Sequence, residues 1–267
     1  MTYDNDRITE YIVVLMILTI PFYIINGLTQ NLPKILPMGL SLGSLAIICP
    51  FITAIILVRK DEHLEGVKSL VKSSLDPRKF KKKWILPDLL IMPGILVGSY
   101  FLLTLQGIKL PQVEFSFVSV VILFVLFFIA AFFEEIGWMG FLYVKLEGKY
   151  NAFESGLLIG LLWAFWHIIL FIQNGHSLIW VVWQCLFCIS ARVLMVWIYN
   201  NTNKSVLSAI IFHTMINVSV TLFPINGSLY DPLTVGLLTT MLVFIVLVLY
   251  EHKTITVNRF RNPVVKA

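Results

Sequence analysis

Charged residues are scarce in this sequence. Only 13% of its 267 residues are Asp, Glu, Lys or Arg, whereas 58% are hydrophobic. Soluble domains carry about 25% charged residues, so the composition excludes an ordinary soluble protein. Alternation of polar and apolar residues at period two is also missing, which excludes a transmembrane β-barrel. We therefore expect an all-α, polytopic membrane helical bundle that forms a single integral membrane domain over residues 1–267.

Cysteine is equally rare. Cys49, Cys185 and Cys188 all fall inside apolar stretches, which argues against a disulfide framework. Cys185 and Cys188 have the CxxC spacing, but on a helix they are two small apolar residues on one face. Metal-binding CxxC pairs usually lie on turns. We therefore expect neither a redox centre nor a metal site at this pair.

Long apolar segments make up most of the sequence. A transmembrane helix needs about 20 such residues, and the sequence offers about eight segments of suitable length. Their predicted ranges are 9–27, 38–58, 85–105, 116–142, 153–173, 178–199, 205–222 and 233–250.

The basic residues show an uneven distribution that predicts the orientation of the helices. The segment Arg59–Trp84 alone holds nine Lys and Arg residues, and only Lys34 and Lys109 fall on the opposite side of an eight-helix arrangement. Because cytoplasmic loops are rich in Lys and Arg, this segment is expected in the cytoplasm, together with both termini. The net charge of +5 is thus explained by a cell membrane and its anionic lipids, and we expect no nucleic-acid partner.

A few polar residues interrupt the apolar segments, where ionisable groups are costly and usually functional. With a rise of 1.5 Å per residue, most of them lie between about 13 and 20 Å from the cytoplasmic ends of their helices. Residues on separate helices at one depth predict a single site. The set comprises Glu134, Glu135, His167, Arg192, His213 and Asn217.

The spacing of these residues is compatible with several kinds of chemistry. His213 and Asn217 are four residues apart and share a helical face, whereas Glu134 and Glu135 point about 100° apart. Two histidines and a carboxylate match a zinc-type ligand set, so Zn²⁺ is one expected cofactor. A metal-free site, in which a glutamate activates water and His and Asn stabilise an oxyanion, is the alternative. A structural polar cluster and a proton relay of a transporter remain open at this point.

Three short motifs resemble those of a known family. The stretches "EEIGWMGFL", "WAFWH" and "HTMIN" are similar to the signature motifs of the CPBP family, also called Abi, which contains CAAX proteases and bacteriocin-processing enzymes. The family pattern is two glutamates followed four residues later by arginine, then Phe-x-x-x-His, then His-x-x-x-Asn or Asp. The resemblance covers residues 116–222, and this range is the expected catalytic core.

The resemblance implies a hydrolase that cleaves a peptide bond inside the bilayer, an intramembrane metalloprotease. Glu134, His167 and His213 would bind the metal or the catalytic water, Glu135 would support them, and Asn217 would join His213 at the oxyanion. The implied substrate is a membrane-associated peptide or lipidated protein, either prenylated or bacteriocin-like. Water would reach the site through a cavity open to the cytoplasm.

Two positions depart from the family pattern. Met139 stands where the family usually has arginine, and Trp163 stands where it usually has phenylalanine. We hypothesise that Arg192, on another helix, supplies the missing cation to the glutamates; Trp163 and Trp138 are the other expected supporting residues. The Met139 departure also keeps an alternative open, a non-catalytic peptide-binding or bacteriocin-immunity protein that retains the fold.

Overall fold

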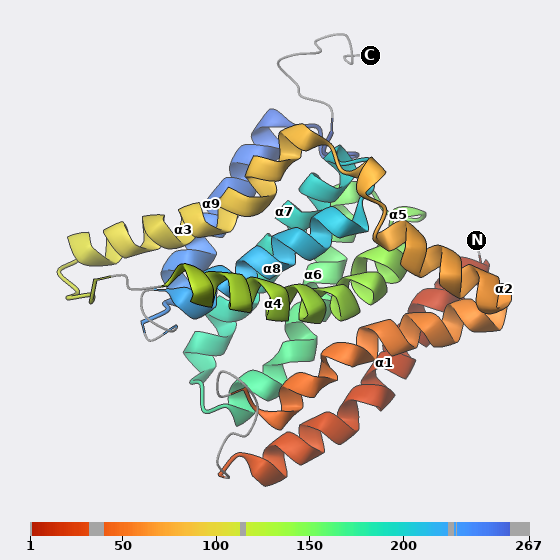
Figure 1. Ribbon diagram of the computed structural model, residues 1–267, viewed down its shortest axis with the longest axis horizontal. Coiled ribbons are helices and arrows are strands. Elements are labelled where there is room, and N and C mark those ends of the chain that lie inside the picture. Colours follow the sequence, from red (N-terminus) through yellow and green to blue (C-terminus); the bar gives the residue numbers. More distant parts are fainter. Residues whose placement is uncertain (1, 32–39, 113–115, 224–226, 228, 257–267) are drawn as a thin grey trace.

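The computed structural model describes residues 2–31, 40–112, 116–223, 227 and 229–256, and every element in these ranges is helical (Figure 1). The elements are α1 (Thr2–Thr29), η2 (Leu42–Ile48), α2 (Cys49–Ser74), η3 (Pro77–Lys79), η4 (Lys82–Trp84), α3 (Ile85–Leu105), α4 (Phe117–Gly137), η5 (Trp138–Leu142), α5 (Tyr143–Glu147), α6 (Ala152–Gln173), α7 (Leu178–Asn201), α8 (Val206–Leu222) and α9 (Pro232–Leu249).

The predicted all-α membrane bundle is confirmed. Seven helical stretches are long and apolar enough to cross a membrane, and α8 is a shorter apolar helix of 17 residues. Each of the eight predicted segments corresponds to one of these helices, and α1 begins earlier than predicted, at Thr2. Residues 38 and 39 of the second segment lie outside the described residues. The protein is therefore a multi-pass membrane protein.

Two further boundaries differ from the prediction. The segment after Arg59 was expected to be a loop, but α2 continues as a helix to Ser74. The apolar stretch ends at the first charged residues, but no proline interrupts the helix before Pro77. A charged helix is stable once it leaves the apolar layer. The helix is interrupted only at His63, which has a φ of 57°. At the other boundary, the predicted segment 116–142 is α-helical only to Gly137.

Side-chain caps mark where the helices of the bundle begin. The side chain of Asn151 accepts a hydrogen bond from the backbone of Glu154, whose carboxylate accepts one from the backbone of Asn151. This capping box satisfies amide groups that have no partner within the helix, and it fixes the start of α6. Ser177, Ser205 and Asp231 cap α7, α8 and α9 in the simpler form.

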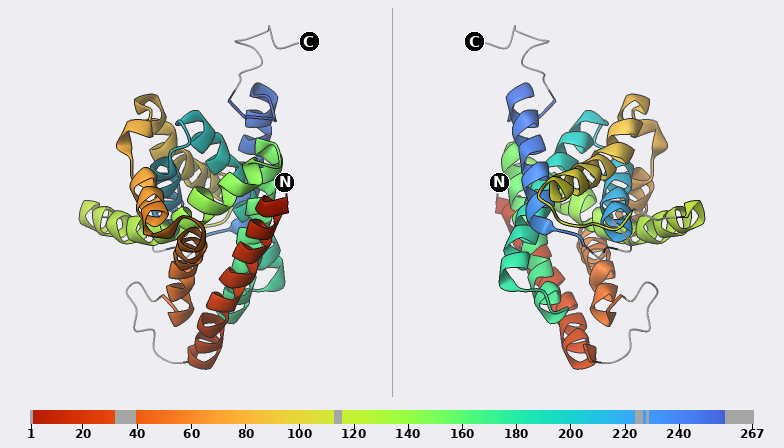
Figure 2. Two further views of the ribbon diagram at one scale, coloured as in Figure 1. Left: turned by 90° about the vertical axis from the view of Figure 1, so that its right-hand side faces the viewer. Right: turned by 90° about the vertical axis from the view of Figure 1, so that its left-hand side faces the viewer.

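The helices pack so that four of them surround one interior region. α6 packs along α7, α4 along α8, and α3 lies beside α9 (Figure 1). From the N-terminus, α1 runs along the edge of the bundle beside α6 (Figure 2). The polar residues predicted to form a site are carried by α4, α6, α7 and α8, which the packing brings together.

Candidate active site

The two glutamates lie in the last turn of α4, directly before a π-helical turn. Glu134 and Glu135 are both buried, and η5 follows Gly137 with one extra residue in its turn. Such π-turns are rare and occur frequently at functional sites. Gly137 allows the approach of α2, because a Cβ atom there would lie 2.3 Å from the carbonyl oxygen of Pro50. The chain thus holds the glutamates rigidly at a point where two helices nearly touch.

Glu135 bridges two side chains from other helices. Its Oε1 pairs with Nδ1 of His213 at 2.7 Å, and its Oε2 accepts a hydrogen bond from Nη1 of Arg192 at 2.6 Å. Glu135 and Arg192 are both 0% exposed. An ion pair this deeply buried is held together because neither charge can reach water. The pairing that the sequence predicts between Arg192 and the glutamates is therefore present, at Glu135.

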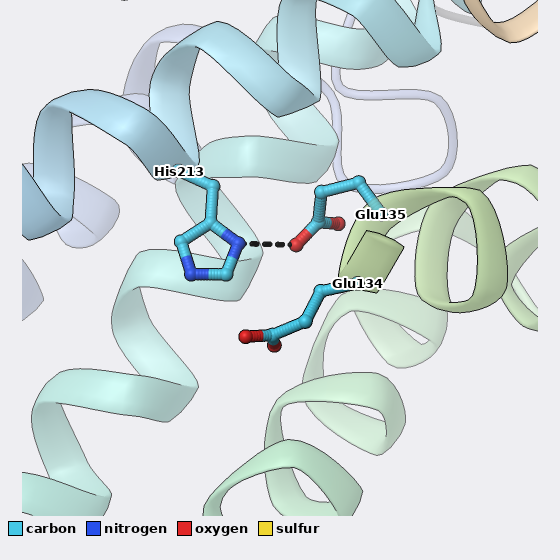
Figure 3. Close-up of side chains that lie close together, drawn as sticks. All are labelled: Glu134, Glu135 and His213. Atoms are coloured by element: carbon cyan, nitrogen blue, oxygen red, sulfur yellow. Dashed lines mark hydrogen bonds and ion pairs between the residues drawn. The ribbon is translucent and has the colours of Figure 1, made fainter. Parts of the chain in front are cut away.

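Glu134 has a different environment from its neighbour. Its Oε2 accepts a hydrogen bond of 3.0 Å from Nε1 of Trp163, and its side chain faces a cavity rather than an ion pair. Figure 3 shows the Glu134 carboxylate directed to the same side as the imidazole of His213. One ligand atom from each of Glu134, Glu135 and His213 lies within 4.8 Å of the others, close enough to hold a metal ion.

Trp163 contacts both Glu134 and Arg192. Its N–H binds Glu134, while the guanidinium carbon of Arg192 lies 4.2 Å from the centroid of its ring. A cation over the face of tryptophan is attracted by the ring quadrupole, more strongly where water is excluded. The phenylalanine of the family pattern has a ring but no N–H to donate. Trp163, one of the two departures from the pattern, therefore contacts the arginine that pairs with Glu135.

Both histidines are anchored by Nδ1. His213 uses Nδ1 toward the carboxylate of Glu135, and His167 uses Nδ1 toward the carbonyl oxygen of Trp163 at 2.8 Å. Because these oxygens accept hydrogen bonds, each Nδ1 carries the hydrogen. In a neutral ring, Nε2 then presents its lone pair. This is how histidine ligands of metal ions are commonly held.

A cavity of about 540 Å³ brings the predicted residues together. Its polar lining includes four of the five predicted catalytic residues, from three helices: Glu134, His167, His213 and Asn217. Glu135, Arg192 and Trp138 lie behind this surface, where the Arg192 guanidinium is 5.8 Å from the Trp138 ring. His167 lines the cavity but lies outside the compact group of Glu134, Glu135 and His213.

Gln184 and Trp166 are among the lining residues that were not predicted from the sequence. Gln184 on α7 faces the cavity and accepts a hydrogen bond of 2.8 Å from the hydroxyl group of Tyr230. Trp166 lines the cavity and donates its N–H to Thr19 on α1 at 2.9 Å. Gln184 had a usable signal, since it is a polar side chain in the middle of an apolar segment. Trp166 stands directly before His167 in the stretch quoted above, but a tryptophan in an apolar segment does not by itself indicate a cavity.

The chain is similar to known proteins over the segment that carries this cluster. Residues 116–219 match the model of the family described as Type II CAAX prenyl endopeptidase Rce1-like. The chain is also similar to CAAX prenyl protease 2 of Methanococcus maripaludis, with 28% identity over 223 residues, which cover 78% of this chain and 80% of the relative. The matched segment carries all the residues of the candidate site. The predicted resemblance is thereby confirmed, and both comparisons support a protease of the CAAX type.

Proposed function

We propose that this protein is an intramembrane endopeptidase that hydrolyses a peptide bond in a membrane-associated peptide, either prenylated or bacteriocin-like. The single observation that carries the proposal is the buried cluster of Glu134, Glu135 and His213 at one cavity. Two adjacent carboxylates and an imidazole in an apolar layer are costly to maintain and fit the activation of water. The similarity to CAAX proteases supports the same conclusion.

In the proposed reaction, Glu134 is the general base. It removes a proton from a water molecule, the water oxygen attacks the peptide carbonyl, and the C–N bond breaks as the proton passes to the leaving amine. Glu134 faces the cavity and has no ion pair with Arg192, which leaves its carboxylate available to water. Glu135 cannot take this role, because Arg192 and His213 already engage its two oxygens.

His213 and Asn217 are proposed to stabilise the oxyanion. They lie one turn apart on α8 and both face the cavity. The hydrogen bond from Nδ1 of His213 to Glu135 fixes the orientation of the ring, and in the protonated ring Nε2–H can donate to developing negative charge. Arg192 in turn neutralises Glu135 and holds it in place. Glu135, Arg192 and Trp163 are therefore positioning residues.

Zinc is the alternative cofactor: Glu134 and His213 belong to the compact group of possible ligands, and His167 lines the same cavity. Glu134, His167 and His213 would hold it, since Nδ1 of each histidine is anchored and Nε2 is left to ligate. When bound, zinc would lower the pKa of a coordinated water and polarise the carbonyl. Glu134 is the general base in the metal-free reaction, whereas with zinc bound it would be a ligand, and the choice between a metal and a metal-free enzyme is made by experiment.

The test is cleavage of a lipidated, membrane-embedded reporter peptide by the purified protein. Glu134→Gln and His213→Ala should each abolish cleavage, while Glu65→Gln, at a side chain 84% exposed on the cytoplasmic extension of α2, should not. Loss of cleavage on adding a chelator, with recovery on adding zinc, identifies the metal mechanism. Cleavage that survives in both site variants would refute the proposed peptidase.

The non-catalytic alternative rested on Met139. With Arg192 beside Glu135, the cation that Met139 lacks is supplied from α7. A cellular phenotype kept by both Glu134→Gln and His213→Ala, without cleavage of any member of a peptide library, would favour the binding or immunity protein instead.

A further inference from the structure

Gln184 is a polar side chain in the wall of the catalytic cavity that the proposed reaction does not use. It lies on α7 among apolar residues, it is only 9% exposed, and it lines the cavity. An amide group in an apolar layer costs free energy unless its donors and its acceptor are paired. The partners of this amide therefore indicate what the cavity binds.

The oxygen of this amide is engaged within the protein. The hydroxyl group of Tyr230 donates a hydrogen bond of 2.8 Å to Oε1 of Gln184. The ring of Tyr230 is itself held against α7, with centroid distances of 6.2 Å to Trp180 and 6.5 Å to Phe187. Residues 180, 184 and 187 are spaced by four and three, so they share one helical face. These contacts fix the direction in which the amide points.

The nitrogen of the amide has no hydrogen-bond partner among the residues that the structure describes. A glutamine side chain carries two N–H groups on Nε2, and both are donors. Because Oε1 is turned to Tyr230, these N–H groups are presented to the cavity that Gln184 lines. They are available to an acceptor oxygen of a molecule that enters the cavity.

The helix α7 places this amide at a defined distance from the catalytic cluster. Gln184, Cys188 and Arg192 follow one another at intervals of four. Cys188 lines the same cavity, and Arg192 pairs with Glu135. At 1.5 Å per residue, Gln184 lies about 12 Å along α7 from Arg192. An extended peptide covers that distance in about three to four residues, so a substrate cleaved at Glu134 can bring a backbone carbonyl oxygen to the amide.

On the basis of the proposed function, we propose that Gln184 is a substrate-binding residue. Its amide donates to a backbone carbonyl oxygen of the peptide, about three to four residues from the scissile bond. Tyr230 is the positioning residue that orients this amide. A bond to the backbone fixes the register of the peptide without selecting a side chain. The apolar part of the lining, which includes Leu126, Phe127 and Leu170, receives the side chains of the peptide.

Peptide binding tests the proposal without depending on catalysis. The fluorescent, lipidated reporter is titrated onto purified Glu134→Gln protein in nanodiscs, and Kd is measured from fluorescence anisotropy. In this background we expect Gln184→Met, which keeps the length of the side chain but has no amide, to raise Kd by about five- to tenfold, the value of one hydrogen bond. Val182→Leu, at an exposed position on α7 that does not line the cavity, should leave Kd unchanged.

A set of modified reporters locates the acceptor oxygen. In each reporter, one peptide bond is replaced by an alkene of the same shape, which lacks the carbonyl oxygen. We expect one replacement, about three to four residues from the cleaved bond, to weaken binding to the protein with Gln184 and to have no effect on Gln184→Met. A merely structural role of Gln184 would lower the Tm and leave the same dependence on the carbonyl in both proteins, which would overturn the proposal.

Tyr230→Phe separates the orientation of the amide from its presence. The variant keeps the ring that contacts Trp180 and Phe187, but it removes the hydroxyl group that holds Oε1 of Gln184. We expect a smaller rise in Kd than for Gln184→Met, and no further rise when the two changes are combined, because both act through one amide. Additive effects of the two changes would overturn the role given to Tyr230.

Turnover distinguishes a failure of this inference from a failure of the proposed function. With Glu134 intact, Gln184→Met should raise KM and leave kcat within about twofold, because the lost contact is made equally before and during the reaction. Cleavage with unchanged KM and Kd in Gln184→Met would overturn the inference and leave the peptidase standing. Binding that depends on Gln184, without cleavage of any reporter, would leave the inference standing and refute the peptidase. If no reporter binds the Glu134→Gln protein, both are overturned.

Discussion

Arg192 and Met139 are the two residues at which we test our hypothesis on the source of the cation beside Glu135. Arg192 is 0% exposed and donates to Glu135 from α7, whereas Met139 is equally buried at the position where the pattern has arginine. Removing one partner of a buried ion pair costs about 3–5 kcal/mol, because the other charge stays buried without compensation. Arg192→Met should therefore lower both the Tm and the cleavage rate severely.

A second variant places the arginine at position 139, where the family pattern has it. In the double variant Arg192→Met with Met139→Arg, the cation lies on the same helix as Glu135, and we expect part of the stability and cleavage to return. Lys68→Met, which breaks a surface pair with Glu65, should change stability by at most about 1 kcal/mol. Thermal unfolding in detergent and reporter cleavage measure both properties. An unchanged Tm in Arg192→Met would mean that the ion pair is not needed.

At this scale the sequence was informative about which polar residues come together and less so about how they bond. Glu134, His167, His213 and Asn217 could be predicted because polar side chains rarely gather at one depth of a bilayer unless they form a site. The different environments of Glu134 and Glu135 could not, because they depend on side chains from α6 and α7. Nothing in the sequence indicates that Trp163 donates to one glutamate while its ring contacts the arginine that binds the other.

Among the helices, the contact between α6 and α7 positions the site. Gly156, Gly160 and Ala164 follow one another at intervals of four on α6, a small-residue stripe that lets two membrane helices approach closely. A Cβ atom at Gly160 would lie 2.9 Å from the Cα of Ile189 and 3.3 Å from the Cβ of Arg192. Since α6 carries Trp163 and α7 carries Arg192, the distance between these helices sets the geometry around both glutamates.

Gly160→Ala should therefore reduce both stability and activity. Overpacking of this kind costs about 1–3 kcal/mol, and the displaced helices should separate Arg192 from Trp163 and slow cleavage. Gly94→Ala on α3 is the matched control, because nothing lies within 4 Å of the added Cβ atom. Alanine there should be neutral or stabilise the helix by up to about 1 kcal/mol. Equal Tm values for the two variants would contradict this account of the α6–α7 contact.

The helical segments could be predicted from hydropathy alone, because a bilayer demands apolar stretches of a fixed length. The charged extension of α2 from Arg59 to Ser74 was missed for the same reason, because the residues of a helix become polar where it leaves the lipid. The π-turn η5 was also missed. One extra residue in a turn changes neither composition nor periodicity enough to be recognised.

The whole molecule has a basic, packed end, which carries the segment 59–84. At the packed end, the segment that follows α9 folds back over α6 and α7. The backbone N–H of Ala152 donates to the carbonyl oxygen of Lys253 at 2.7 Å. The side chain of Asn201 donates to the carbonyl oxygen of Ile255 at 2.8 Å. The charge asymmetry of the ends was readable from the sequence. The shape of the cavity was not, because it depends on which side chains fill the space between helices.

The returning segment should stabilise the bundle without taking part in catalysis. In the double variant Asn200→Ala with Asn201→Ala, the bonds to the carbonyl oxygens of Thr254 and Ile255 are lost, at about 1 kcal/mol for each hydrogen bond. The bonds of Asn200 with the Tyr143 hydroxyl and of Asn201 with the Trp197 carbonyl oxygen are lost with them. We expect a lower Tm and faster proteolysis after α9, with unchanged cleavage per folded molecule at low temperature. Lys253→Ala is the control, because only its backbone binds α6. A Tm equal to that of the control would show that this contact contributes nothing, whereas a loss of cleavage at full stability would mean that the packed end reaches the site.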